Sequence, residues 1–138
     1  MTQAILYPLL VMVFITFAVL LRLGYLRVSY LQKERIHPQN VADRKGAADV
    51  FKPINPLADH FQNLLELPVL FYLLVVLLLV LAKVDMTYVA MAWLFVALRL
   101  VHTVIHCTYN KVRHRFLAFL LSTVVLLVMW GRFLVQVV

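Results

Sequence analysis

The chain has 138 residues, of which 64% are hydrophobic and 14% are charged, and its formal net charge is +7. Its mean hydropathy of +0.94 lies far above that of soluble globular domains and excludes that class. The basic residues gather near the ends of apolar runs, where membrane topology alone would place them, so we expect no nucleic-acid partner. A lone cysteine, Cys107, excludes an internal disulfide.

Four apolar runs predict transmembrane helices, because each holds about 20 mostly apolar residues, enough to cross a lipid bilayer. They cover about residues 4–27, 59–82, 87–109 and 115–137. Helices are expected because backbone polar groups in lipid must be satisfied within the segment. The first run lacks a basic flank and a small-residue cleavage site, so it is interpreted as a span and not as a signal peptide. The predicted fold is therefore an all-α integral membrane protein, a four-helix up-down bundle in one domain over residues 1–138.

The loops between the spans predict the orientation in the membrane. The first loop, residues 28–58, is long and polar, whereas "KVDM" and "NKVRH" are short and require antiparallel neighbours. Basic residues border or lie in the first and third loops: Arg27, Lys33, Arg35, Arg44, Lys45, Lys52, Lys111, Arg113 and Arg115. The second loop has only Lys83, so we expect loops 1 and 3 in the cytoplasm and both termini outside, in the inner membrane if the cell is bacterial. Arg22 and Arg132 are then explained by reaching toward the interfaces.

Polar residues continue into the second and third spans. Asp59, Gln62, Asn63 and Glu66 fall at i, i+3, i+4 and i+7, so they form one stripe on a helix. Arg99 lies ten residues from the inner end of its span, or about 15 Å at helical rise, which is near the bilayer midplane. Such a charge normally faces a bundle interior and has a partner there.

The short second loop predicts which polar residues meet. In a hairpin about residues 84 and 85, residues whose numbers sum to about 169 lie at equal depth, which places Glu66 level with His102 and Asn63 level with His106. We therefore expect Glu66 and Arg99 to be counter-ions. Such a cluster could serve only to hold the two helices together through polar contacts. Its spread over at least five polar side chains favours a binding site.

A second interpretation of the cluster is a metal site. His102 and His106, at i and i+4, could share a metal with Glu66 as a carboxylate ligand. Arg99 would repel a cation, so we assign no metal ligand from the sequence. Cys107 points about 100° away from His106 on the helix and is interpreted as a small buried hydrophobe.

Two longer motifs resemble a known family. The segments "NLLELP" in the second span and "RLVHTVIHCTYNKVRHR" closing the third, together with four spans and a long first cytoplasmic loop, resemble the MAPEG family, the membrane-associated proteins in eicosanoid and glutathione metabolism. The resemblance covers nearly the whole chain. It implies a homotrimer of four-helix bundles that binds glutathione between subunits at the cytoplasmic side and takes a lipophilic substrate from the bilayer.

The resemblance also implies site residues. Asn63 and Glu66 match the family's N-x-x-E pair, with Glu66 expected at the amino group of glutathione, and Arg99 matches the buried arginine of the third helix. His102 and His106 match two glutathione-contacting positions. The remaining implied residues are Tyr109 one turn beyond, Arg27 as a contact for an anionic end of glutathione, and either Arg115 or Arg113 as the catalytic arginine that stabilises the glutathione thiolate.

Two functions follow from this resemblance. The first is a glutathione transferase or peroxidase acting on lipophilic electrophiles, with glutathione as co-substrate. The second is a non-catalytic member of the family that binds a lipid or a partner protein. Asp59 and Gln62 stand where glutathione-using members carry arginines, and Phe116 stands where a hydroxyl is expected.

Overall fold

Seven helical segments make up the computed structural model, which describes residues 2–109 and 111–138, apart from the side chains of Thr2 and Arg44. Asn110 of the third predicted loop lies outside the described residues. The segments are η1 (Thr2–Ile5), α1 (Leu6–Lys33), η2 (Pro38–Val41), α2 (Arg44–Val50), α3 (Asn55–Val80), α4 (Met86–Cys107) and α5 (Val112–Val137).

Four of these helices, α1, α3, α4 and α5, are long and apolar enough to cross a membrane. This confirms the predicted all-helical fold with four spans. The observed helix bounds differ most from the predicted ones around the first loop. There α1 continues past residue 27 to Lys33, and α3 already begins at Asn55. The remaining polar segment is partly ordered by η2 and α2.

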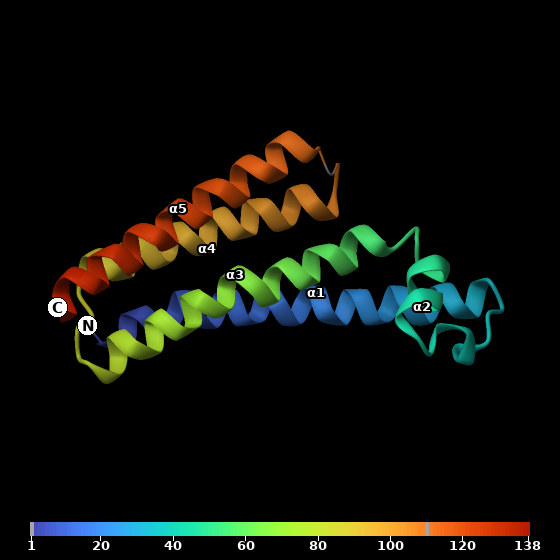
Figure 1. Cartoon of the computed structure of the whole chain (residues 1–138), viewed down its shortest axis with the longest axis horizontal. Helices are drawn as coiled ribbons and strands as arrows, with labels where there is room; N and C mark the ends of the chain where they lie inside the picture. The colour runs from blue at the N-terminus through green and yellow to red at the C-terminus, as the bar shows by residue number, and fades with distance from the viewer. Residues whose placement is uncertain (1, 110) are drawn as a thin grey trace.

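The long helices form two pairs. Figure 1 shows α4 beside α5 and α3 beside α1, with both chain termini at one end of the molecule. The two pairs lie close together at this end and diverge toward the end that carries α2. Their divergence matters for function, because the polar residues of α3 and α4 lie in the diverging half.

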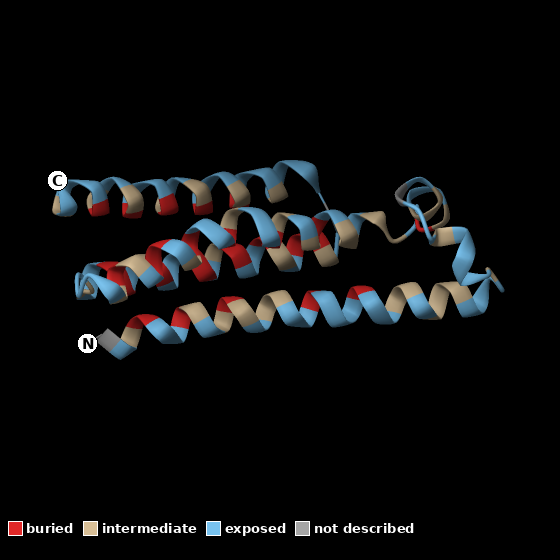
Figure 2. Ribbon diagram, turned by 60° about the horizontal axis from the view of Figure 1, so that its bottom comes forward, coloured by how far each residue is buried: buried red, intermediate tan, exposed pale blue. Residues whose placement is uncertain are grey.

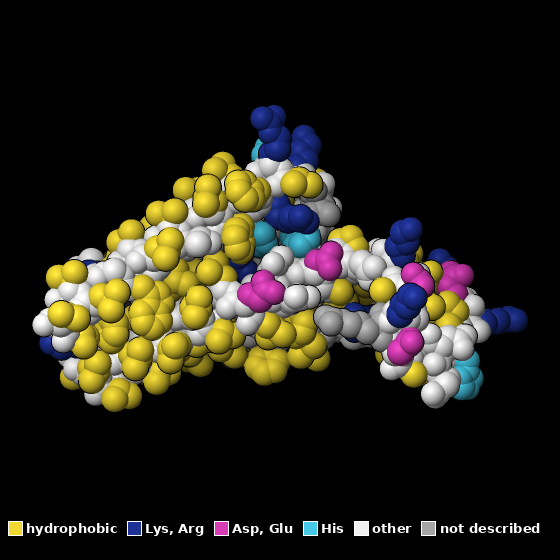
Figure 3. Space-filling model, in the orientation of Figure 1, with side chains coloured by type: hydrophobic (Ala, Val, Ile, Leu, Met, Phe, Trp, Pro, Cys, Tyr) yellow, Lys and Arg dark blue, Asp and Glu magenta, His cyan; other side chains and the backbone are white. Residues whose placement is uncertain are grey.

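Each long helix buries one narrow stripe. On α4 the buried stripe starts apolar with Tyr88, Ala92 and Phe95 and continues with Arg99 and then with two histidines. Figure 2 shows buried positions on the inward sides of the helices, and Figure 3 shows hydrophobic side chains over much of the face that it draws. Phe14, for example, is 69% exposed. In a bilayer such side chains contact lipid. The high apolar content of the sequence is therefore explained by the exposed apolar side chains.

The first loop packs on the end of α1 through Phe51, which is 5% exposed. Its ring lies 6.3 Å from the ring of Tyr30 and 5.2 Å from the guanidinium carbon of Arg27. Asp43 caps α2 by accepting a hydrogen bond from the amide of Gly46. Arg27 is thus part of the contact between α1 and the loop.

The predicted register of the α3–α4 hairpin is wrong. His60 contacts Thr103, and Arg99 reaches the carbonyl of Asn63, so residues of equal depth have numbers that sum to about 163 and not to about 169. One physical reason is the length of the turn, because α3 ends at Val80 and α4 begins at Met86. A second is that α4 packs most extensively against α5, so α3 is not its closest neighbour.

Candidate functional site

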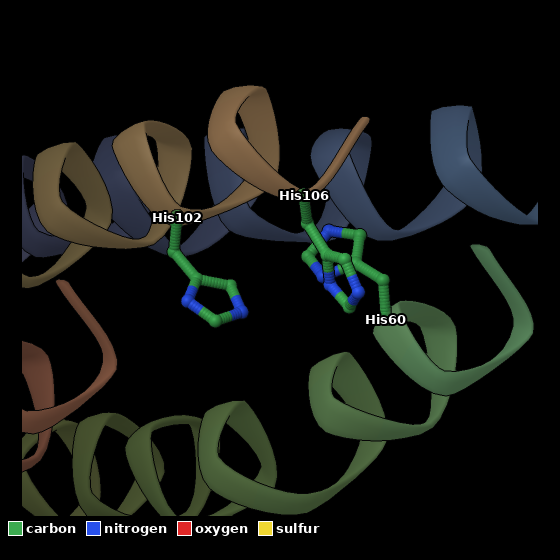
Figure 4. Close-up of side chains that lie close together, drawn as sticks. All are labelled: His60, His102 and His106. Atoms are coloured by element: carbon green, nitrogen blue, oxygen red, sulfur yellow. The ribbon is translucent and has the colours of Figure 1, made fainter. Parts of the chain in front are cut away.

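Three histidines meet where the two helix pairs begin to diverge. His60 comes from α3, and His102 and His106 come from successive turns of α4; all three are buried. The ring centroid of His60 lies 5.3 Å from that of His102 and 4.7 Å from that of His106. Figure 4 shows the three rings gathered in the space between the helices. This histidine cluster (His60, His102 and His106) forms the centre of the candidate site.

Hydrogen bonds hold one nitrogen of each ring. Nε2 of His60 lies 3.1 Å from the hydroxyl of Thr103, whose own proton goes to the carbonyl of Arg99 at 2.8 Å, so the imidazole donates. Nδ1 of His102 donates to the carbonyl of Arg115 at 3.0 Å. Nε2 of His106 accepts from the Arg115 guanidinium at 3.0 Å. Arg115 therefore fixes two of the three rings, one through its backbone and one through its side chain.

Arg99 lies one turn from His102 on the same face and is 0% exposed. Its Nη2 donates to the backbone carbonyl of Asn63 at 3.0 Å. Its Nε and Nη1 are buried and have no hydrogen-bond partner among the described residues. A buried guanidinium with two unsatisfied nitrogens is costly, so this position is suited to an anionic ligand.

The predicted ion pair between Glu66 and Arg99 is wrong within this chain. Glu66 is exposed and accepts a hydrogen bond from Gln62 at 3.1 Å. The inward face of α3 carries His60, Leu64 and Phe71. The polar stripe that includes Asp59, Gln62 and Glu66 is therefore exposed, because α3 buries the face that is apolar beyond His60.

Two cavities reach the histidine cluster. One of about 190 Å³ is lined by Asn63, His102, Arg115 and three apolar residues of α5. Another of about 290 Å³ is lined by Arg22, His106, Cys107 and residues that begin α3. Figure 3 shows Lys or Arg and His side chains in the hollow between the helix pairs, with acidic side chains beside it. The histidine cluster is thus buried but lies next to space that a ligand can fill.

The structure separates the two candidate catalytic arginines. Arg115 lines the first cavity and contacts His106, whereas Arg113 is exposed two residues earlier, on another face of α5. Tyr109 is 53% exposed, and its hydroxyl lies 3.1 Å from Nδ1 of His114, away from the histidine cluster. The structure therefore brings Arg115 into the site and leaves Arg113 and Tyr109 outside it, as it does Arg27.

Sequence reasoning missed two residues of the site, His60 and Arg22. His60 lies on the same helical face as Leu64 and Phe71, which is the signal that could have found it. Arg22 was explained by reaching toward the interface, but it lines the cavity that contains His106. The hydroxyl of Thr103 donates to the carbonyl of Arg99 in its preceding turn, and it also accepts from His60.

Comparison with known families decides the classification. The model of the MAPEG family matches residues 5–135, nearly the whole chain. The chain belongs to the MAPEG family. No curated protein and no solved structure matches it. As a MAPEG protein it is an integral, multi-pass membrane protein of the glutathione and eicosanoid metabolism family. In this MAPEG chain, the N-x-x-E pair is split: Asn63 accepts a hydrogen bond from Arg99 through its carbonyl, while Glu66 is exposed and bonded to Gln62.

Proposed function

We propose that this MAPEG protein is a membrane-bound glutathione transferase or peroxidase that acts on lipophilic electrophiles. The observation that carries the proposal is Arg99, a fully buried guanidinium of which two nitrogens have no partner among the described residues. Its hydrogen-bond partner Asn63 lines a cavity to which Arg115 adds a second positive charge. A cationic, partly desolvated cavity favours an anion, and glutathione supplies both carboxylates and a thiolate.

Arg115 is the residue to which we assign stabilisation of the thiolate. A thiol near its ordinary pKa is mostly protonated at neutral pH, and a neighbouring guanidinium favours the anion. The sulfur then attacks the electrophile and forms the new bond, while any leaving group departs with the electrons of the bond that breaks. His106 positions Arg115 by accepting a hydrogen bond from its guanidinium.

A homotrimer accounts for Glu66 within this proposal. Glu66 is exposed on the outer face of α3, whereas Arg99 is buried behind it. In a trimer, the two side chains would contact one glutathione from neighbouring subunits. Glu66 would then bind the glutathione amino group from the surface of an adjacent copy. Asp59 is exposed on the same face and adds negative charge there.

The test is direct binding of glutathione to detergent-purified protein. We expect ultraviolet absorbance from the thiolate and an increase in the thermal unfolding midpoint. Arg115→Ala should abolish the thiolate absorbance, and Arg113→Ala, the matched control on the exposed face, should retain it. Absence of both signals with millimolar glutathione would overturn the proposal. Loss of the thiolate absorbance in Arg113→Ala alone would show that Arg113, and not Arg115, stabilises the thiolate.

A third cavity favours the alternative function, a non-catalytic protein that binds a lipid. It has a volume of about 340 Å³ and lies between α1 and α4, lined mainly by apolar residues such as Val19, Leu100 and Val104. Arg22 at its border could meet a lipid headgroup. Native mass spectrometry of protein extracted in mild detergent distinguishes the two functions. A retained lipid together with no response to glutathione would favour the alternative.

A further inference from the structure

We infer that His60, His102 and His106 form a binding site for a transition-metal ion with one open coordination position. One ring nitrogen from each histidine lies within 4.8 Å of the others. A zinc ion with ligands at its usual distance would need these nitrogens about 3.3 Å apart. Side-chain rotations that bring the rings together by about 1.5 Å or less are therefore sufficient.

The hydrogen bonds of the rings are the second observation that points to a metal. Each ring has one nitrogen held by a neighbour, and the other nitrogen is buried with no partner among the described residues: Nδ1 of His60, Nε2 of His102 and Nδ1 of His106. His60 and His102 have the arrangement typical of metal-binding histidines, in which an outer partner accepts from one nitrogen and so fixes the tautomer and orients the ring. Thr103 and the carbonyl of Arg115 accept from His60 and His102, so the free nitrogens of these two rings carry lone pairs.

His106 differs from the other two rings. The Arg115 guanidinium donates to its Nε2, so the proton resides on Nδ1. Metal binding by His106 therefore requires Arg115 to release this ring. Arg115 and a metal ion compete for His106, and removal of the Arg115 side chain is expected to tighten metal binding. A purely structural role of the histidine cluster predicts no such gain.

The charge of the site restricts the ion and its fourth ligand. Three neutral imidazoles suit zinc, copper, nickel or cobalt, and they contribute no negative charge. Arg99 and Arg115 add positive charge nearby. An anionic fourth ligand, such as hydroxide or a thiolate, would offset the cation and give the unsatisfied nitrogens of Arg99 an acceptor. An anionic ligand of this kind would reduce the repulsion between Arg99 and the metal ion that the sequence led us to expect.

The experiment uses tag-free, detergent-purified protein and Co²⁺ as a spectroscopic probe, without glutathione. We expect one Co²⁺ per chain with the intense visible absorption bands of four-coordinate cobalt. His60→Asn and His102→Asn should lose the bands, whereas His37→Gln and His114→Gln, which alter the two histidines outside the cluster, should retain them. Thr103→Val should weaken binding about 10- to 100-fold, because it removes the outer partner of His60. Arg115→Leu should strengthen binding.

A measurement on the unmodified protein keeps the test decisive if a histidine variant fails to fold. Electron paramagnetic resonance of bound Cu²⁺ should show coupling to imidazole nitrogens. No cobalt bands and no nitrogen coupling would overturn the inference. It would also be overturned by bands that depend on His37 or His114, since these would report an adventitious surface site. The cobalt bands and the copper spectrum are measured without glutathione, so their outcome does not depend on the proposed function.

Discussion

Arg99 is the largest fully buried side chain among the described residues, and only one of its three guanidinium nitrogens has a partner. Polar side chains that are buried without partners lower stability, and they persist where a ligand uses them. Complete burial together with unsatisfied nitrogens is typical of a residue that binds a ligand and not of a residue with a purely structural, or scaffold, role. A scaffold arginine would have been satisfied by Glu66, but Glu66 is exposed on the outer face of α3.

The first prediction separates these two roles of Arg99. Because the ligand-free protein leaves two of its nitrogens unsatisfied, Arg99→Leu should leave the free energy of unfolding unchanged or raise it by up to about 3 kcal/mol. The same variant should lose stabilisation by glutathione. Thermal unfolding in detergent, with and without glutathione, measures both effects. A strongly destabilised ligand-free variant would identify Arg99 as a structural residue.

At the opposite end of the bundle, Asp85 is held by Arg132 and by the first turn of α4. Its carboxylate accepts hydrogen bonds from Arg132 at 2.9 and 2.5 Å, and from the amide of Tyr88 at 3.0 Å as the N-cap of α4. The guanidinium of Arg132 also lies 4.4 Å from the centre of the Tyr88 ring. The hydrogen bonds from Arg132 lower the pKa of Asp85 from 3.8 to about 2. Arg132, expected merely to reach the interface, thus ties α5 to the start of α4.

The second prediction concerns the pH dependence of this pair. Because the pKa of Asp85 is lower in the folded state than in the unfolded state, the pair stabilises the protein above about pH 4, and this stability is lost as the pH falls toward about 2. The side chains are 41% and 31% exposed, so solvent screening limits the effect to about 1 kcal/mol. Asp85→Asn should flatten this part of the stability–pH profile, measured by circular dichroism. An unchanged profile would contradict the assignment.

At the scale of elements, α1 and α3 end in the same way. Each helix is followed by a residue in the left-handed region, Arg35 and Ala82, both with φ of 52°. After α3, the amide of Lys83 reaches back to the carbonyl of Leu78 at 2.9 Å, which closes a Schellman motif. Glycine is the usual residue at this position, because a Cβ atom is unfavourable there.

The third prediction follows from this turn. Ala82→Gly should raise the free energy of unfolding by about 0.5–1 kcal/mol, because it relieves the left-handed strain. Ala82→Val should lower it, because a branched side chain is still less compatible with positive φ. Thermal unfolding midpoints of the two variants should move in opposite directions. A shift of both in the same direction would show that the turn does not have this conformation.

At the scale of the whole molecule, lipid-facing surface and charge placement determine how the bundle lies in the membrane. All four long helices expose large hydrophobic side chains, and basic residues border the first and third loops far more than the second. The histidine cluster lies in the half of the bundle nearer the basic loops. If those loops are cytoplasmic, the site opens to the compartment that contains glutathione.

The fourth prediction tests this orientation. In a Cys107→Ala background, Gln39→Cys in the first loop and Lys83→Cys in the second place exposed thiols on opposite sides of the membrane. A membrane-impermeant maleimide applied to intact cells should label the second variant alone, because the positive-inside rule keeps the first loop in the cytoplasm. Permeabilised cells should show labelling of both variants. Labelling of only Gln39→Cys in intact cells would reverse the orientation.

The sequence predicted the composition of the site better than its contacts. It identified Arg99, His102 and His106 from their depth and spacing in the apolar spans and Arg115 from the family resemblance, and the structure brings these residues together. It paired Arg99 with the wrong partner and missed His60. Both errors have one cause: the face of α3 that turns inward is set by packing between helices that are distant in sequence.

The sequence by itself determined that this chain spans the membrane with four helices, because hydrocarbon requires long apolar segments and each segment must satisfy its own backbone. Only the tertiary structure decided which face of each helix turns inward. On α3 the polar stripe and the face with His60 compete for burial, and the second face is buried because beyond His60 it is apolar and packs against α1, α4 and α5. This orientation exposes Glu66, buries His60 beside His102 and His106, and leaves Arg99 without a counter-ion among the described residues.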